Sequence, residues 1–273
     1  KMMVGREVTF AVEKEEAKPK EVVVKIENLS VKNSKKVLGL KNFSLDIKAG
    51  EIVGIAGVER NGQTELVEAL TGLCKVESGT ITFKNKDITK HSIKQRIDEG
   101  IAHIPEDRHK RGLVLDYSME ENLALKVYNK APYSKFGILN KSKIAEYAKH
   151  IIETFDVRSG EGGKSIARSL SGGNQQKGVI GREIEINGDL LIAVQPTRGL
   201  DVGSIEYIHK RLVEQRDKGK AVLLVSLELD EVLNVSDRIA VVNNGELIGI
   251  VNANETDENK IGLMMAGIKE DKQ

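Results

Sequence analysis

The sequence predicts a mixed α/β fold in which a parallel core sheet, an antiparallel β subdomain and an inserted helical subdomain belong to one chain. Three observations predict it. Short, unbroken apolar runs are typical of parallel strands covered on both faces. Other segments place β-forming residues between polar turns, as antiparallel strands do. One long internal segment is rich in helix formers. With 273 residues, 40% of them hydrophobic, the chain is long enough to bury such a core.

The strands are expected in two groups that differ in pattern. In the first group β-forming residues alternate or cluster between polar turns, and the second consists of unbroken apolar runs. A glycine loop and a helix over Thr64 to Leu70 follow the first of these runs. The antiparallel strands are expected at residues 22–26, 43–47 and 80–83, and the parallel strands at residues 51–56, 189–194 and 221–226.

Residues 118–155 are expected to form the helical part, because helix formers dominate this segment. Its apolar set consists of Leu123, Leu125, Val127, Ile144, Ala148, Ile151, Ile152 and Phe155. A second helix is expected after the glycine pair Gly172-Gly173, through about Glu185. The helical part therefore interrupts the α/β core.

Two features concern the ends of the chain. Residues 11–21, AVEKEEAKPKE, are charged, contain Pro19 and lack an apolar period, which predicts a tether. Residues 2–6, MMVGR, echo residues 264–268, MMAGI, about one chain length later. This echo indicates that residues 1–21 are the tail of a preceding domain and its linker. A chance match of small and apolar residues is the alternative.

Composition excludes several classes of protein. The 42 Lys and Arg residues nearly balance the 41 Asp and Glu residues and are interspersed with them, so no nucleic-acid partner is expected. Cys74 is the only cysteine, which excludes an internal disulfide, fits a reducing cytoplasm and predicts a small buried residue. The histidines show no metal-ligand spacing. No apolar run approaches the ~20 residues of a membrane span, and the start lacks the apolar core of a signal peptide.

A glycine-rich loop between an expected strand and an expected helix is the candidate phosphate site. Residues 57–64, GVERNGQT, follow the spacing G-x-x-x-x-G-K-[ST], except that Gln63 stands where the pattern has lysine. Backbone amides in such a loop attract phosphate without a side-chain charge. The missing lysine removes a charge-assisted contact of about 1.5–3 kcal/mol. The candidate nucleotide-binding residues are Gly57, Asn61, Gly62, Gln63 and Thr64; a glycine turn without a ligand is the alternative.

A second anion site is predicted in residues 170–177, LSGGNQQK. Ser171 precedes Gly172-Gly173 and a helix, and a serine cap with exposed amides at a helix start can hold an anion. A plain capped helix is the alternative. The candidate residues are Leu170, Ser171, Gly172, Gly173, Asn174 and Gln175.

These two segments, with residues 104–116, IPEDRHKRGLVLD, and residues 195–203, QPTRGLDVG, resemble the second nucleotide-binding domain of ABC importers for sugars and nucleosides. The resemblance covers about residues 22–268. In that family two such domains lie in one polypeptide, the first with intact ATPase motifs and the second degenerate, which agrees with the echo of the chain ends. Glutamine at the lysine position is closer to the nucleoside, BmpA-associated group, whereas sugar importers often have arginine there.

The resemblance implies an ABC-type P-loop NTPase domain with a RecA-like parallel core sheet. Its core and β subdomain are expected at about residues 22–105 and 178–268, and its helical subdomain at about residues 106–177. ATP and Mg²⁺ are the implied cofactors, with weak or absent binding in this half. Thr64 keeps the hydroxyl that would contact Mg²⁺.

The resemblance also implies that the residues for hydrolysis are missing. Val194 stands in place of the aspartate that holds Mg²⁺ through water, and Leu227 in place of the switch histidine. Gln195 replaces the glutamate that polarises the attacking water; glutamine can orient water but does not accept a proton at neutral pH. Lys32 and Asn33 lie where an adenine-stacking tyrosine usually sits. No catalytic residue is therefore expected in this half.

The motifs that face a partner are retained. In the family the LSGGNQ motif crosses a dimer interface and covers the γ-phosphate held by the partner's phosphate loop. Gly199-Leu200-Asp201 resembles the D-loop, which couples the two sites, although a turn and helix cap at Asp201 is the alternative. Glu106 replaces the glutamine that senses Mg²⁺ and couples the core to the helical subdomain, and its carboxylate could still approach a metal.

The implied function is that of a degenerate ATPase half in an importer of nucleosides or sugars. Its implied partners are the preceding nucleotide-binding domain of the same polypeptide, the transmembrane permease subunits and, indirectly, a substrate-binding lipoprotein. The implied location is the cytoplasmic face of the cell membrane. Two alternatives remain open: an autonomous ATPase with Glu106 or Asp107 as an unconventional base, and a non-transport ABC protein acting on ribosomes or DNA.

Overall fold

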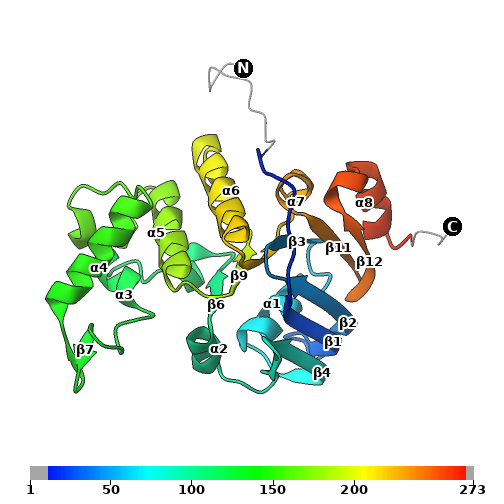
Figure 1. The fold of residues 1–273 in the computed structure, drawn as a ribbon, viewed down its shortest axis with the longest axis horizontal. Coiled ribbons are helices and arrows are strands. Elements are labelled where there is room, and N and C mark those ends of the chain that lie inside the picture. The colour runs from blue at the N-terminus through cyan, green and yellow to red at the C-terminus, as the bar shows by residue number, and fades with distance from the viewer. Residues whose placement is uncertain (1–11, 269–273) are drawn as a thin grey trace, which may run out of the picture. The chain divides into compact units, whose positions relative to one another are not determined.

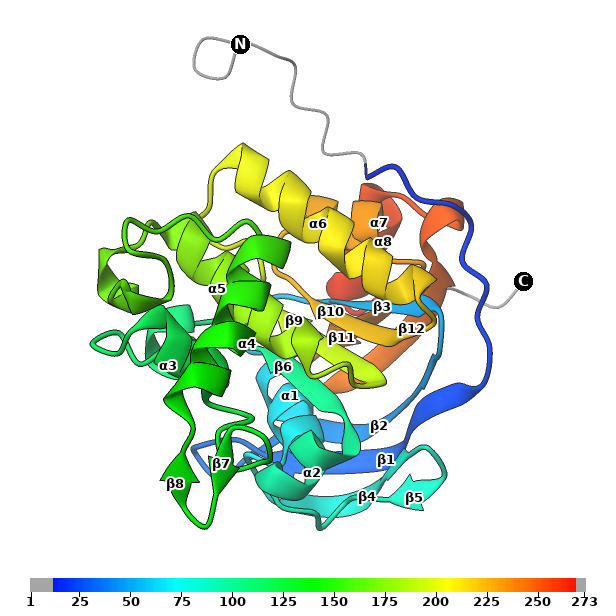
Figure 2. The ribbon, with the colours of Figure 1, turned by 60° about the vertical axis from the view of Figure 1, so that its left-hand side comes forward.

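The computed structural model describes residues 12–268 and divides the chain into two compact units (Figures 1 and 2). Among the described residues, the first unit comprises residues 12–103, 188–195 and 206–268, and the second comprises residues 104–187 and 196–205. The echo between residues 2–6 and 264–268 has its first half outside the described residues.

An antiparallel sheet forms one layer of the first unit. Its strands pair in the order β2-β1-β4-β5, and the three predicted antiparallel segments lie in it, as expected. Apolar residues such as Ile26, Phe43 and Ile81 point into the core and are fully buried. The strands are β1 (Val22–Lys32), β2 (Leu38–Lys48), β4 (Val76–Phe83) and β5 (Lys86–Asp87).

The core sheet forms the second layer of the first unit. Its six strands have the order β12-β11-β3-β10-β9-β6, and β11, β3, β10 and β9 pair in parallel. All residues of β3 and β10 are buried, which explains their unbroken apolar sequences and confirms the prediction of parallel strands. The strands are β3 (Glu51–Ala56), β6 (Ile101–Ile104), β9 (Leu190–Val194), β10 (Ala221–Val225), β11 (Arg238–Asn243) and β12 (Glu246–Asn252).

Helices cover both faces of the core sheet. Leu66 and Leu70 of α1 join the core shared with the antiparallel sheet, whereas Val232 of α7 and Met264 of α8 pack on the other face with Ile239 (Figure 1). The helices of this unit are α1 (Gln63–Thr71), α2 (Ile93–Glu99), α7 (Leu229–Val235) and α8 (Glu258–Met265); α6 (Val202–Asp217) begins in the second unit and continues into the first, and a short 3-10 turn, η4, spans Ala253–Glu255.

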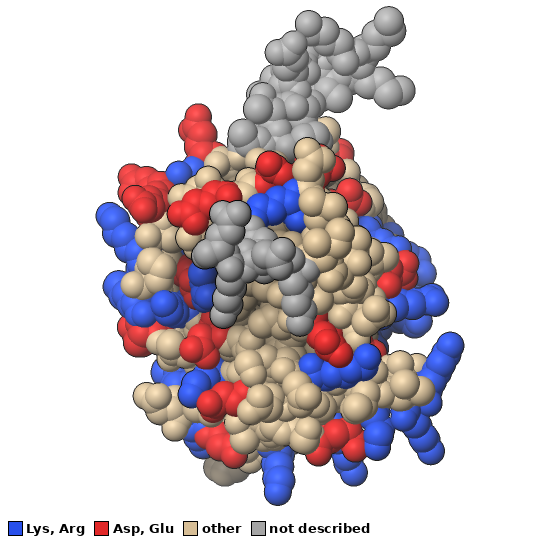
Figure 3. All heavy atoms as spheres, turned by 90° about the vertical axis from the view of Figure 1, so that its right-hand side faces the viewer, with Lys and Arg blue, Asp and Glu red and all other residues tan. Residues whose placement is uncertain are grey.

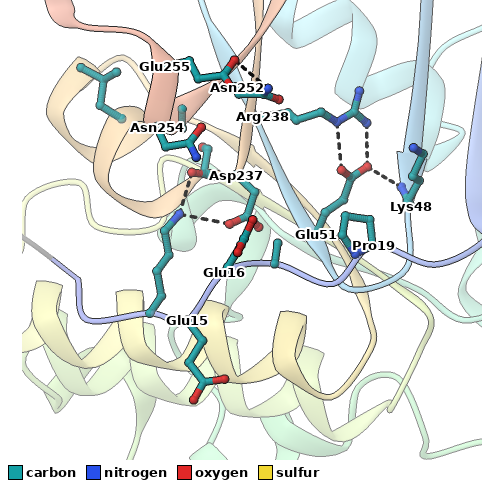
Figure 4. A pocket seen from close by; sticks show the side chains of 15 residues that line it. Glu15, Glu16, Pro19, Lys48, Glu51, Asp237, Arg238, Asn252, Asn254 and Glu255 are labelled. Carbon is teal, nitrogen blue, oxygen red and sulfur yellow. Dashed lines mark hydrogen bonds and ion pairs between the residues drawn. The ribbon is translucent and has the colours of Figure 1, made fainter.

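The predicted tether is attached to the first unit by Lys14. Residues 12–20 form no helix or strand, yet the Lys14 ammonium donates to the backbone oxygens of Val235 (2.9 Å) and Ser236 (2.6 Å) and pairs with Asp237 at 3.2 Å. Its burial lowers the pKa of Lys14. The tether thereby caps the C-terminal end of α7. It also borders a polar cavity of about 700 Å³, which Glu51 and Arg238 line as well (Figure 4).

Charges are mixed on the face of the first unit shown in Figure 3, where lysine and arginine side chains alternate with aspartate and glutamate. None of the helices within residues 12–268 has both the length and the apolar character of a membrane span. Cys74 is half-buried rather than buried, which corrects the expectation, and partial burial raises the pKa of its thiol to about 11. The thiol is therefore protonated at neutral pH.

The second unit is built on three helices, which confirms the helical insert. α4 presents Ile144, Ala148 and Ile151 to its neighbours, and all three are buried. A two-stranded hairpin, which the sequence did not predict, precedes α4. The elements are α3 (Met119–Ala124), β7 (Ser134–Lys135), β8 (Ile138–Leu139), α4 (Lys141–Thr154) and α5 (Gly172–Glu185), with short η1 (Arg108–Gly112), η2 (Gly162–Lys164) and η3 (Ala167–Ser169).

Two glycines inside α5 allow its neighbours to pack closely. Glycine in a helix costs about 1 kcal/mol relative to alanine, so alanine would otherwise be favoured. A Cβ at Gly178 would lie 2.5 Å from Cε of Met119, and a Cβ at Gly181 would lie 2.7 Å from Cγ2 of Ile151 and 2.9 Å from Phe155. The α4–α5 contact therefore requires glycine at position 181.

Gly181→Ala is expected to lower the free energy of unfolding by up to about 2 kcal/mol, because an overpacking cost of about 1–3 kcal/mol outweighs a gain of about 1 kcal/mol in helix propensity. Urea unfolding followed by circular dichroism measures this change. Gly262→Ala in α8 is the matched control, since its Cβ would enter open space; it should add about 0.5–1 kcal/mol. A stabilised Gly181→Ala variant would contradict the packing argument.

Candidate functional site

Three loops of the first unit gather at the carboxyl edge of the core sheet. β3, β10 and β9 are adjacent and parallel, with Val225 paired to both Ile55 and Val194. The strands therefore end side by side, and each is followed by a predicted site segment. The phosphate loop follows β3, Leu227 follows β10, and Gln195 follows β9. In open α/β sheets ligands bind at this edge.

The phosphate loop has the strand–loop–helix context that its spacing predicts. Gly57 is buried at the end of β3, and Gly62 precedes α1 with φ of +109°. A Cβ at Gly62 would lie 2.9 Å from the oxygen of Gly39, so both conformation and space require glycine. No side chain caps α1, and Thr64 is exposed in its first turn.

The side chain of Gln63 folds back into the loop. Its Oε1 accepts a hydrogen bond from the amide of Asn61 at 3.0 Å, and its Nε2 donates to the oxygen of Val58 at 3.0 Å. Only 7% of Gln63 is exposed. A Cβ at Gly57 would lie 2.7 Å from Nε2, so the carboxamide also packs against the start of the loop.

The positions expected to lack hydrolytic groups stand at the ends of β9 and β10. Val194 is half-buried and ends β9, and Leu227 is 42% exposed after β10. Gln195 is buried in the left-handed backbone region, with φ of +47°, and its amide donates to the oxygen of Val225 at 2.8 Å. No carboxylate occupies any of these three positions.

The donor set for a metal in the first unit is small. Mg²⁺ is usually held by one or two carboxylates together with phosphates and water, and Thr64 contributes only a hydroxyl. Among residues 12–268 no group of three or more His, Cys, Asp or Glu side chains could hold a metal ion. A Mg²⁺ ion at this loop would therefore depend on the Thr64 hydroxyl, on water and on the phosphates of a bound nucleotide.

Lys32 and Asn33 lie where the family usually has an adenine-stacking tyrosine, and both make structural contacts in this chain. Lys32 ends β1 and pairs with Glu77 at 2.7 Å. The Asn33 side-chain oxygen accepts from the amides of Lys35 (3.0 Å) and Val37 (3.2 Å), which closes a turn. Neither side chain offers an aromatic face.

In the second unit, Ser171 caps the start of α5 and remains exposed. Its hydroxyl oxygen accepts from the Asn174 amide at 3.4 Å and from the Asn174 side chain at 2.9 Å. Leu170 is buried just before it. Gln175 is buried and structural, since it donates to Ala167 and its Oε1 lies 2.7 Å from Nε2 of His109. The serine is thus the exposed polar group at the helix start.

Gly172 and Gly173 leave space for side chains from two other segments of the second unit. A Cβ at Gly172 would lie 2.9 Å from the Arg108 guanidinium, and one at Gly173 would lie 2.6 Å from Oγ of Ser204. Asp201 caps the start of α6 by accepting from the amide (3.0 Å) and hydroxyl (2.8 Å) of Ser204. These hydrogen bonds from Ser204 lower the pKa of Asp201, so its carboxylate stays ionised at neutral pH.

Two arginines that sequence analysis did not single out complete this surface. Arg198 forms an ion pair with Glu106, and its backbone oxygen accepts from Arg108 at 3.2 Å. Arg108 lies in residues 104–116 and Arg198 in residues 195–203, two segments that resemble the family. That resemblance was the only sequence feature that could have identified them. Gly199 is exposed next to Arg198, and Leu200 is half-buried. We call Glu106, Arg108, Ser171, Gly172, Gly173, Arg198 and Asp201 the signature surface.

The two-layer first unit with its phosphate loop, and the helical second unit, define an ATP-binding cassette fold. A nucleotide-free ATP-binding cassette from an ABC transporter has the same fold, with a TM-score of 0.77 and 25% identity over 92% of this chain and 100% of that one. The family profile for ABC transporters matches residues 40–198, so the chain belongs to the ABC transporter family.

Curated relatives are similar over nearly the whole chain. The nucleoside import ATP-binding protein NupA of Lactococcus lactis is 55% identical over 97% of the chain, and the guanosine import ATP-binding protein NupO of Bacillus subtilis is 54% identical over 97%. In both cases the match covers 52% of the relative. The chain thus spans about half the length of the curated relatives it matches.

Proposed function

We propose that this chain is the degenerate second half of an ABC importer ATPase and completes the ATP site of a preceding half. The observation that carries the proposal is an asymmetry between the two candidate sites. Val194, Gln195 and Leu227 supply no base or metal ligand, whereas Ser171 is exposed at the capped start of α5. One site thus lacks the groups for chemistry, and the other keeps the groups for binding an anion.

The contacts of the signature surface support a role toward a partner. The first amides of α5 and the Ser171 hydroxyl are suited to the γ-phosphate of an ATP bound by another domain. Arg108 lies beside Gly172 and donates a hydrogen bond to the backbone oxygen of Arg198, which is exposed. When the signature surface closes on that phosphate, the ion pair between Arg198 and Glu106 would make the Glu106 loop move as well.

The imported substrate is proposed to be a nucleoside. The support is the 55% and 54% identity to import proteins whose names specify nucleosides and guanosine. Glutamine at position 63 was the sequence feature that pointed to the same group. The proposed partners are a preceding nucleotide-binding domain in the same polypeptide, permease subunits in the membrane and, through them, a substrate-binding lipoprotein. The chain would act at the cytoplasmic face of the membrane.

Steady-state Mg-ATP turnover by the purified chain alone tests the degenerate assignment. We expect turnover to lie at least about 10²-fold below that of the two-domain polypeptide at every protein concentration, because a missing general base alone costs about 10²–10⁴-fold. The two-domain polypeptide is the positive control. Turnover that rises with the square of chain concentration would show catalysis by a homodimer, and turnover linear in concentration would favour an autonomous enzyme using Glu106 or Asp107.

A further inference from the structure

We infer that the Gln63 carboxamide is an internal ligand of the phosphate loop, which a phosphate group must displace in order to bind. The inference rests on the proposed function in one respect, namely that residues 57–64 are a nucleotide site. It goes beyond the loss of a lysine: the substituted residue occupies the loop instead of leaving it vacant. Phosphate binding to the loop is thus opposed by the side chain of Gln63.

Two hydrogen bonds hold the carboxamide inside the loop. The amide of Asn61 points to Gln63 Oε1 at 3.0 Å, in the manner in which a loop amide holds a phosphate oxygen. Nε2 donates to the oxygen of Val58 at 3.0 Å, which ties the two ends of the loop together. A glutamine at this position thereby satisfies one donor and one acceptor at once.

Burial and packing keep the side chain in that place. Gln63 is 93% buried, from its 7% exposure, and its Nε2 lies next to Gly57. The loop around it contains two residues in the left-handed backbone region, Arg60 (φ +69°) and Gly62 (φ +109°). Asn61 is itself restrained, because its backbone oxygen accepts from Gly245 at 3.0 Å. The carboxamide is therefore buried within a loop whose backbone is itself restrained.

Displacement of the carboxamide by phosphate predicts the direction in which removal of the carboxamide changes phosphate affinity. An incoming phosphate would take the Asn61 amide from Oε1 and would leave the oxygen of Val58 without its donor. The displaced carboxamide would have to return to water. A variant without the carboxamide avoids this exchange and should bind phosphate more tightly, even though it carries no cation. If Gln63 instead contacted phosphate directly, its removal would weaken binding.

Calorimetric titration of the chain with ATP and with inorganic tripolyphosphate tests the inference. Tripolyphosphate reports on the loop without a contribution from the base. We expect Gln63→Ala to bind both probes about threefold to tenfold more tightly than the unmodified chain, since one or two hydrogen bonds no longer compete. Gln63→Asn, whose amide is one methylene shorter and cannot bridge both groups, should behave in the same way and serves as the second variant.

Two further variants separate the possible outcomes. Gln63→Glu keeps the acceptor for the Asn61 amide but adds a negative charge, so binding should weaken at least about tenfold. Gln63→Lys restores the cation of the family pattern and should bind more tightly than the unmodified chain. Thermal unfolding of each variant verifies that it is folded.

Equal or weaker binding by Gln63→Ala and Gln63→Asn, alongside tighter binding by Gln63→Lys, would overturn the internal-ligand inference and leave the loop as a nucleotide site. If no variant binds either probe, Gln63→Lys included, the inference and the assignment of residues 57–64 fall together. That second outcome leaves the signature surface unaffected, because its role is tested separately through Ser171.

Discussion

Ser171→Arg in the two-domain polypeptide is expected to lower ATP turnover at least about 100-fold. Ser171 is exposed, and its side chain stands at the start of α5, where the proposed γ-phosphate would lie. Arginine would place bulk where the phosphate must approach the first amides of the helix, and loss of one such donor already costs about 10²–10³-fold in enzymes that stabilise developing charge. Steady-state phosphate release measures the loss.

Gln195→Ala is the control for this experiment, because the proposed degenerate site has no chemistry to lose. Its turnover should stay within about twofold of the unmodified polypeptide. Circular dichroism of Ser171→Arg guards against misfolding, since removal of a serine cap costs only about 1 kcal/mol of stability. Equal losses in the two variants would refute the division of roles between the two sites.

Glu51→Ala is expected to lower the free energy of unfolding by about 3–5 kcal/mol. Glu51 is 1% exposed at the start of β3 and pairs with Arg238 through two bonds of 2.9 Å and 2.6 Å (Figure 4). Its Oε1 also accepts from the amide of Lys48 at 2.7 Å. The hydrogen bonds that Arg238 donates to Glu51 raise the pKa of Arg238, so the substitution leaves a half-buried, unpaired cation and an unsatisfied amide. Guanidinium unfolding measures the change.

Glu27→Ala is the matched control, with the same substitution in the same unit. The Glu27 side chain is 47% exposed and pairs at 2.7 Å with Lys25, two residues away in the same strand, β1. An exposed pair of this kind contributes about 0–1 kcal/mol, because water screens the charges. If both variants lost the same stability, burial would not be what makes the Glu51–Arg238 pair important.

The strands and the helical insert could be predicted because their patterns are local. β3 and β10 are buried on both faces, and that environment selects unbroken apolar runs. The hairpin of β7 and β8 was missed because each strand has only two residues, too few for any period. The anchoring of the tether was missed because Lys14 contacts residues more than 220 positions away.

The candidate sites likewise combine features that the sequence predicts with features that only the structure reveals. Residue types and spacing along the chain were enough to locate the phosphate loop and the LSGGNQ segment. Arg108 and Arg198 could not be recognised as neighbours, because 90 residues separate them in sequence. The sequence revealed that Gln63 is not lysine, but the direction in which its side chain turns depends on the left-handed loop around it.

By itself, the sequence determined the layered α/β fold, the order of the phosphate loop and the LSGGNQ segment, and the presence of uncharged residues at positions 63, 194, 195 and 227. Only the tertiary structure decided that Gln63 fills its own loop, that Gly172 and Gly173 make room for Arg108 and Ser204, and that Lys14 secures the tether. The physical reason is range: periodicity and residue type act over neighbouring positions, whereas packing and buried hydrogen bonds join residues that only the folded chain brings together.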